Sequence, residues 1–144
     1  MGRKILVTPR SFGKTSNEPF ELLKNNNCEI IRNESGKQYS EEELLEIVED
    51  VEGIIVGLDP ISEKVLSRAK KLKVVSKYGV GLDNIDLEAA DRLGIKVTFT
   101  PGANNESVAD FAFSLMMALS RNVIKLDSYV RNNNFSKIIG TEVY

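Results

Sequence analysis

The segment "KVVSKYGVGLDNIDLEAADRLGIKVTF", residues 73–99, decides the fold. It begins and ends with short apolar runs, "KVVSK" and "IKVTF", which have the length and β-branched composition of buried strands. Between them "DLEAADRLG" predicts a helix, with Asp86 as its N-cap and Gly94 at the left-handed position after its end. A strand, a helix and a strand in this order predict two parallel strands joined by a right-handed crossover.

The same alternation occupies the residues before this segment. "SEEELLEIVED" carries a capping box, in which Ser40 and Glu43 each bond to the other's backbone, and Ser62 opens a further helical pattern. "NEPFELLKNNN" supplies the first helix. The three other strand-like runs are "KILVT" (4–8), "CEIIR" (28–32) and "GIIVG" (53–57). We therefore expect a doubly wound α/β domain with five parallel strands, covered by helices on both faces.

The last third of the chain has a different pattern. Residues 105–132 contain neither glycine nor proline, which predicts one long helix. Between Val108 and Leu119, ten of twelve residues are apolar, so we expect another domain or a second copy of the chain to cover this helix. Twelve residues are too short to span a bilayer. The final segment, "FSKIIGTEVY", reads as interrupted, and we expect the natural sequence to continue beyond Tyr144.

Composition excludes several classes of function. A net charge of −2 attracts neither nucleic acid nor an anionic membrane, and without a signal or transmembrane segment we expect a cytoplasmic protein. The single cysteine, Cys28, excludes an intramolecular disulfide and a cysteine-based zinc cage, and the acidic run at 40–50 is interpreted as a solvated helix face, with no metal site. The chain has no histidine, which argues against self-contained acid–base catalysis.

Two glycines, Gly79 and Gly81, follow the fourth strand at the edge where open α/β sheets bind ligands. A dinucleotide fingerprint would need a third glycine, and Asn84 stands at that position. The following helix also begins too late for its N-terminus to meet the phosphates. The spacing therefore argues against pyrophosphate binding by this loop.

Two other readings of the loop are equally supported. The N–H groups of Tyr78, Val80 and their neighbours could form a nest that holds a small carboxylate. Alternatively, the loop is only a tight connection, in which Asp83 and Asn84 make Asx turns.

Three polar residues near this edge are weaker candidates for ligand binding. Arg10 and Lys77 could add charge to a bound anion, but the default for each is a solvated surface cation. Asn104 could bind a ligand, but its position just before "NESVAD" favours a helix cap.

The stretch "KYGVGLDNIDLEAADRLGIKVTFTPGANNESVADFAFSLMMALSR", residues 77–121, resembles the D-isomer-specific 2-hydroxyacid dehydrogenases, and most of all their 3-phosphoglycerate dehydrogenase branch. The resemblance implies a flavodoxin-like substrate-binding domain over residues 1–102. Residues 103–144 would then hold a hinge helix and the start of a separate NAD-binding domain, with a dimer contact along the 104–132 helix. It implies an NAD-dependent oxidoreductase acting on CH–OH groups, which oxidises a small 2-hydroxy acid to a 2-oxo acid. The catalytic arginine, glutamate and histidine of such enzymes would lie beyond these residues, so the 144-residue chain alone should be inactive.

The resemblance also implies roles for individual residues. The loop would receive the substrate carboxylate, Val80 would border the nicotinamide, and Asn104 would bond the substrate from the hinge. The implied substrate-binding residues are Lys77, Tyr78, Gly79, Val80, Gly81 and Asn104. Two positions depart from the phosphoglycerate enzymes, because Gly57 and Lys77 stand where those enzymes carry arginine. The missing cation at Gly57 argues against a phosphorylated substrate unless Lys77 or Arg10 supplies the charge.

An alternative from a different class is a free-standing flavodoxin-like binding or regulatory module that self-associates through the apolar helix. The gene would distinguish the two: a strand followed by G-x-G-x-x-G after Tyr144 favours the dehydrogenase, and a stop codon favours the module.

Overall fold

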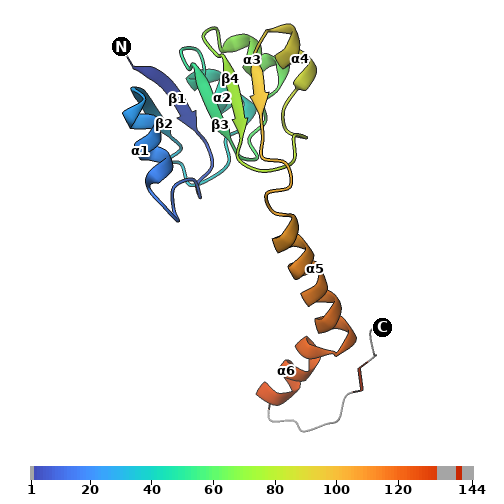
Figure 1. Ribbon diagram of the computed structural model, residues 1–144. Coiled ribbons are helices and arrows are strands. Elements are labelled where there is room, and N and C mark those ends of the chain that lie inside the picture. The colour runs from blue at the N-terminus through green and yellow to red at the C-terminus, as the bar shows by residue number, and fades with distance from the viewer. Residues whose placement is uncertain (1, 133–138, 141–144) are drawn as a thin grey trace. The chain divides into compact units, whose positions relative to one another are not determined.

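The structure is a computed structural model that describes residues 2–132 and 139–140. The chain divides into two compact units, Met1–Pro101 and Gly102–Tyr144, called here the first and second units (Figure 1). Each is described by itself.

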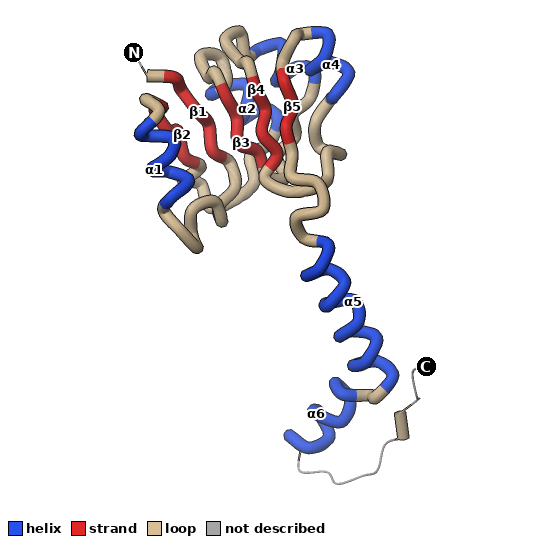
Figure 2. The backbone as a smooth tube through the Cα atoms, in the orientation of Figure 1, coloured by secondary structure: helices blue, strands red, loops and turns tan. Residues whose placement is uncertain are grey.

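The first unit contains one parallel sheet of five strands (Figure 2). Its strands are β1 (Arg3–Val7), β2 (Cys28–Arg32), β3 (Gly53–Val56), β4 (Val74–Lys77) and β5 (Lys96–Thr98). Their order, β2-β1-β3-β4-β5, is that of the flavodoxin-like folds. The predicted fold class is therefore confirmed, and each strand lies within about a residue of the apolar run that predicted it.

Four helices connect these strands. They are α1 (Glu18–Asn25), α2 (Glu41–Ile47), α3 (Glu63–Arg68) and α4 (Leu87–Arg92). The predicted capping box is present, since the Glu43 N–H donates to Ser40 Oγ at 3.2 Å and the Ser40 N–H donates to Glu43 Oε2 at 2.8 Å. Ser62 and Asp86 also cap the helices they precede. Gly94 has a φ of 70°, the left-handed conformation predicted for the end of α4.

The core lies mainly on one side of the sheet. Right-handed crossovers place α1 on one side and α2, α3 and α4 on the other (Figure 1). Apolar side chains from β1, β3 and β4 pack there against those of α2, α3 and α4; the largest fully buried ones are Leu6, Leu44, Ile54, Ile61, Leu66, Val48, Val51, Val56, Val65 and Val75. The direction of strand addition reverses between β1 and β3, which opens a crevice at the carboxyl ends of these strands.

The second unit corrects the prediction of one long helix. It contains α5 (Asn105–Ser120) and α6 (Val123–Arg131), separated at Asn122, which has a left-handed φ of 53°. The N–H of Asn122 bonds to the Leu119 carbonyl at 3.1 Å, which closes α5, and the Asn122 carbonyl accepts the Leu126 N–H at 2.9 Å, which begins α6. Asparagine tolerates the left-handed region, so the helix breaks without glycine or proline.

The apolar side chains of α5 are exposed. No residue of this helix is buried, and Phe111, Phe113 and Leu119 are 65%, 60% and 74% exposed. Within the part of the chain that the structure describes, no helix is long and apolar enough to cross a membrane.

Candidate functional site

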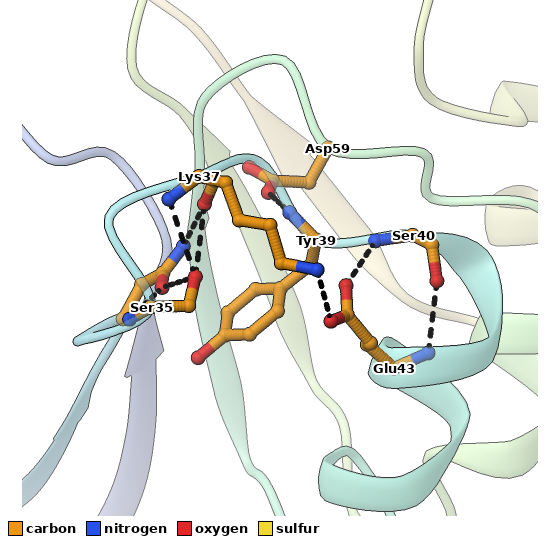
Figure 3. A network of polar contacts seen from close by, with 7 residues as sticks. Ser35, Lys37, Tyr39, Ser40, Glu43 and Asp59 are labelled. Carbon is orange, nitrogen blue, oxygen red and sulfur yellow. Dashed lines mark hydrogen bonds and ion pairs between the residues drawn. The ribbon is translucent and has the colours of Figure 1, made fainter.

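The connection that follows β3 organises the carboxyl edge of the sheet. Thr8, at the end of β1, and Asp59, after β3, are both buried and joined by a hydrogen bond from Thr8 Oγ1 to Asp59 Oδ2. The Gly57 N–H donates to Thr8 Oγ1 at 3.1 Å. Asp59 Oδ1 accepts the Tyr39 N–H at 2.8 Å, which brings in the connection after β2 (Figure 3). Burial, and then the charge of Asp59, raises the pKa of the Tyr39 phenol.

Lys77 joins this network from β4. Its residue is only 6% exposed, and its ammonium donates to the Gly57 carbonyl and to Asn84 Oδ1, both at 2.6 Å. Burial lowers the pKa of Lys77, although the carboxylates of Asp83 and Asp59 oppose the shift. The prediction of a solvated surface cation is therefore wrong, because the partners of Lys77 come from segments 7 and 20 residues away. Its role in substrate binding stays a prediction.

Asn84 completes the same network. Its amide nitrogen donates to the Asp59 carbonyl at 2.7 Å and to the Gly57 carbonyl at 3.2 Å. The Asx turn that one of the two readings of the loop gave to Asn84 is therefore not formed, since the Asn84 side chain bonds to the connection after β3. Asn84 thus accepts from the Lys77 ammonium at the end of β4 and donates to two carbonyls of the connection after β3.

The glycine loop presents free backbone donors, one position later than predicted. The Tyr78 N–H is used by the sheet, where it donates to the Val56 carbonyl at 2.8 Å. Among the residues that the structure describes, no acceptor takes the N–H groups of Gly79, Val80 or Gly81. Gly79 has a φ of 143°, and its carbonyl is held by the N–H and hydroxyl of Thr100 at 3.3 and 3.2 Å. The nest predicted at Tyr78 therefore excludes Tyr78 and can begin only at Gly79.

A cleft of about 480 Å³ opens beside this loop, at the crevice between β1 and β3. The connections after β1, β2, β3 and β4 all contribute; the lining residues are Thr8, Pro9, Arg10, Ser11, Lys14, Lys37, Gln38, Gly57, Leu58, Asp59 and Tyr78. Its charged residues are three cations, Arg10, Lys14 and Lys37, and one carboxylate, Asp59. Sequence reasoning missed Lys14 and Lys37. The segment "TPRSFGK" after β1 was the available signal, since the first strand of this topology always borders the crevice.

Aromatic packing fixes the segment that carries two of these cations. The Phe12 ring lies edge-on to Phe20, with centroids 5.1 Å apart, and edge-on to Tyr78, at 5.7 Å. Gly13 has a φ of 74°, and a side chain there would overlap the Phe20 ring. Phe12 therefore links the segment after β1 to the glycine loop.

Asn104 belongs to the second unit. It occupies the N-cap position of α5, and its carbonyl accepts the Val108 N–H at 2.9 Å, but its side chain makes no capping hydrogen bond. The capping prediction is therefore wrong for the side chain, and the substrate-binding role stays a prediction.

Comparison with known proteins places this arrangement in a family. The catalytic domain of the D-isomer specific 2-hydroxyacid dehydrogenases matches residues 6–135. The chain belongs to this family. It is 41% identical over 112 residues to a glyoxylate reductase of Korarchaeum cryptofilum, a match that covers 73% of this chain and 34% of the relative.

Two solved dehydrogenases have the same fold. The NAD⁺-bound 3-phosphoglycerate dehydrogenase of Entamoeba histolytica superposes with a TM-score of 0.75 and 28% identity, over 99% of this chain and 43% of that one. The D-lactate dehydrogenase of Aquifex aeolicus, in complex with NAD and lactic acid, gives a TM-score of 0.76 and 27% identity, over 93% and 39%. The chain thus spans less than half the length of these dehydrogenases, and NAD is the cofactor of the family.

Proposed function

We propose that this chain is the substrate-binding part of an NAD-dependent D-2-hydroxyacid dehydrogenase, which interconverts a small 2-hydroxy acid and its 2-oxo acid. One observation carries the proposal. The backbone N–H groups of Gly79, Val80 and Gly81 have no protein acceptor among the described residues, and they follow the carboxyl end of β4, an interior strand of the sheet. A substrate carboxylate can accept from these groups.

The loop suits a small anion for physical reasons. Gly79 has the positive φ that a side chain would oppose, so the chain can turn and present successive donors. The bonds from Thr100 to the Gly79 carbonyl hold one end of the turn, and the Tyr78 N–H holds it to the sheet. Donors fixed before the substrate arrives contribute to binding and orientation without reorganising.

The proton transfer would come from outside these residues. The chain has no histidine, and both bonds of the buried Lys77 ammonium go to the protein's own acceptors. We propose that a histidine and an arginine of the remaining part of the enzyme act on the substrate, while this chain holds its carboxylate.

The cofactor would also be bound mainly by that remaining part. The glycine loop does not fit a pyrophosphate, because the Asn84 side chain fills the third glycine position and is committed to Asp59 and Gly57. When bound, NAD accepts or returns the hydride at the substrate's C2. Val80 is 38% exposed on the loop, which suits the border of the nicotinamide.

The apolar surface of α5 supports a further part of the proposal, namely assembly. Exposed side chains such as Phe111 and Phe113 form a surface that soluble proteins normally cover, and we propose that a second copy of the chain covers it.

The carboxylate site can be tested with the 144-residue chain by NMR. Titration with D-glycerate should shift the backbone amide signals of residues 79–81, because a carboxylate would accept from them. Glyceramide, which keeps the hydroxyls but lacks the charge, is the matched control and should leave these signals in place. Equal shifts with both ligands, or no shift at 79–81, would contradict the proposal. The chain alone should reduce no NAD with any D-2-hydroxy acid.

A further inference from the structure

We infer that the substrate carries a second anionic group, a phosphate or a second carboxylate, and that Arg10 and Lys14 hold it in the cleft beside the glycine loop. The inference rests on the proposed function and specifies its substrate class.

The cleft contains an excess of positive charge that its own protein groups do not neutralise. Asp59 is its only lining carboxylate within the described residues; it is buried, and it accepts from Thr8 and from the Tyr39 N–H. Lys37 is paired with Glu43 at 2.8 Å (Figure 3). The remaining two cations, Arg10 and Lys14, form no ion pair with any carboxylate that the structure describes.

Lys77 cannot supply this charge to a substrate in the cleft. Its ammonium is buried and bonded to Gly57 and Asn84, and it does not line the cleft. Arg10 and Lys14, by contrast, are exposed and line the cleft. The cations available to a ligand in this cleft therefore come from the connection after β1.

The segment that carries the two cations packs against the first residue of the glycine loop. Tyr78, the first residue of that loop, lines the cleft, and its ring packs on Phe12, which lies between Arg10 and Lys14 in the chain. Arg10 also donates to the Gly36 carbonyl, which restricts its side chain. A substrate whose first carboxylate meets the loop would therefore extend its far end toward this pair.

The side-chain types fit either anion. The planar guanidinium of Arg10 can form two parallel hydrogen bonds with a carboxylate or a phosphate, and Lys14 adds a point charge. The cleft, at about 480 Å³, lies in the usual range of small-molecule sites and exceeds what a two-carbon acid needs.

Matched ligand pairs test the inference by NMR titration of the 144-residue chain at constant ionic strength. D-3-phosphoglycerate is compared with D-glycerate, and D-malate with D-lactate, because each pair differs in the second anion. At least one doubly anionic ligand should bind about tenfold more tightly than its partner, as charge-assisted hydrogen bonds would provide. The preferred member of the set identifies phosphate or carboxylate as the second group.

Variants assign the effect to the two residues. Arg10→Gln with Lys14→Gln should abolish the preference, while D-glycerate should still shift the amide signals of residues 79–81. Lys70→Gln with Lys71→Gln, which removes two exposed cations before β4, at the opposite edge of the sheet, should keep it. Equal affinity within both pairs, or a preference that survives in the Arg10 and Lys14 variant, would overturn the inference. In either case a D-glycerate response at residues 79–81 would still support the proposed function, whereas its absence would count against that function.

Discussion

The ammonium of Lys77 lies 2.6 Å from the side-chain oxygen of Asn84, and the amide of the same asparagine donates to the Asp59 carbonyl at 2.7 Å. A residue of the glycine loop therefore holds both a buried cation and the connection after β3. The loops of the candidate site depend on a side chain that would be read as a surface turn residue in the sequence.

We expect Asn84→Ala to destabilise the protein more than Lys77→Met. The first change leaves the buried ammonium with one acceptor and removes the donor to Asp59, which should cost about 2–4 kcal/mol. The second also removes the charge whose burial is unfavourable, so its cost should be about 1 kcal/mol. Urea unfolding followed by circular dichroism measures both. A larger loss in Lys77→Met would show that the ammonium, not the asparagine, stabilises the edge.

Gly13→Ala should be more destabilising than Gly36→Ala. Both glycines have nearly the same positive φ, 74° and 73°, so alanine carries a similar backbone cost of about 1 kcal/mol at each. At Gly36 the added methyl group meets open space, whereas at Gly13 it overlaps the ring of the buried Phe20. We expect about 1–2 kcal/mol more for Gly13→Ala, measured as above. Equal losses would mean that Phe20 moves aside freely.

The capping box should make stability depend on pH in the acid range. The hydrogen bond from Lys37, and then the one from the Ser40 backbone, lowers the pKa of Glu43 below its usual value. The unfolded chain therefore binds the proton more readily, and the stabilisation is complete above the unfolded pKa of about 4.3 and is lost as the pH falls through the lower folded value.

Thermal unfolding of Glu43→Gln tests this dependence. Its Tm should lie below that of the wild type at pH 7, and the difference should shrink toward pH 3. Glu46→Gln removes an exposed carboxylate from the same helix and is the matched control. A Tm difference that stays constant from pH 7 to pH 3 would exclude the ionised carboxylate of Glu43 as the source of the stabilisation.

Introducing charge on α5 should abolish self-association. Phe111→Glu with Phe113→Glu places two carboxylates on the exposed apolar surface, and we expect a monomer by light scattering at concentrations where the proposed wild-type dimer would form. Leu22→Glu, at an apolar residue of α1 that is 64% exposed, should leave the dimer intact. A wild-type chain that is monomeric at tens of micromolar would contradict the proposed assembly.

The features that sequence predicted well depend on neighbours along the chain. The capping box at Ser40 and Glu43 and the left-handed Gly94 are local, because each is decided within a few residues. Apolar runs likewise identified the strands, since burial on both faces leaves a continuous hydrophobic signal.

The break at Asn122 was not predictable in the same way. Breaking signals are usually glycine or proline, and asparagine in the left-handed region is a minority conformation. Nothing else within "SRNVIK" distinguishes a break from a continuous helix.

The sequence located the glycine loop at the carboxyl end of β4, but it did not predict the contacts that the loop makes. Lys77 is buried because its hydrogen-bond acceptors belong to other connections of the sheet. The Tyr78 N–H donates to the carbonyl of Val56 on the neighbouring strand β3. Lys14 and Lys37 line the same cleft only because the direction of strand addition reverses beside β1. Such contacts depend on topology, which residue spacing does not encode.

Asn84 also bears on how this loop can evolve. A change to glycine would complete the 79, 81, 84 spacing of a dinucleotide fingerprint in one step. The same substitution would remove the Asn84 acceptor of the buried Lys77 ammonium and the two hydrogen bonds that Asn84 donates to the connection after β3. The loop is therefore separated from a dinucleotide fingerprint by at least two coupled substitutions, one at Asn84 and one at Lys77.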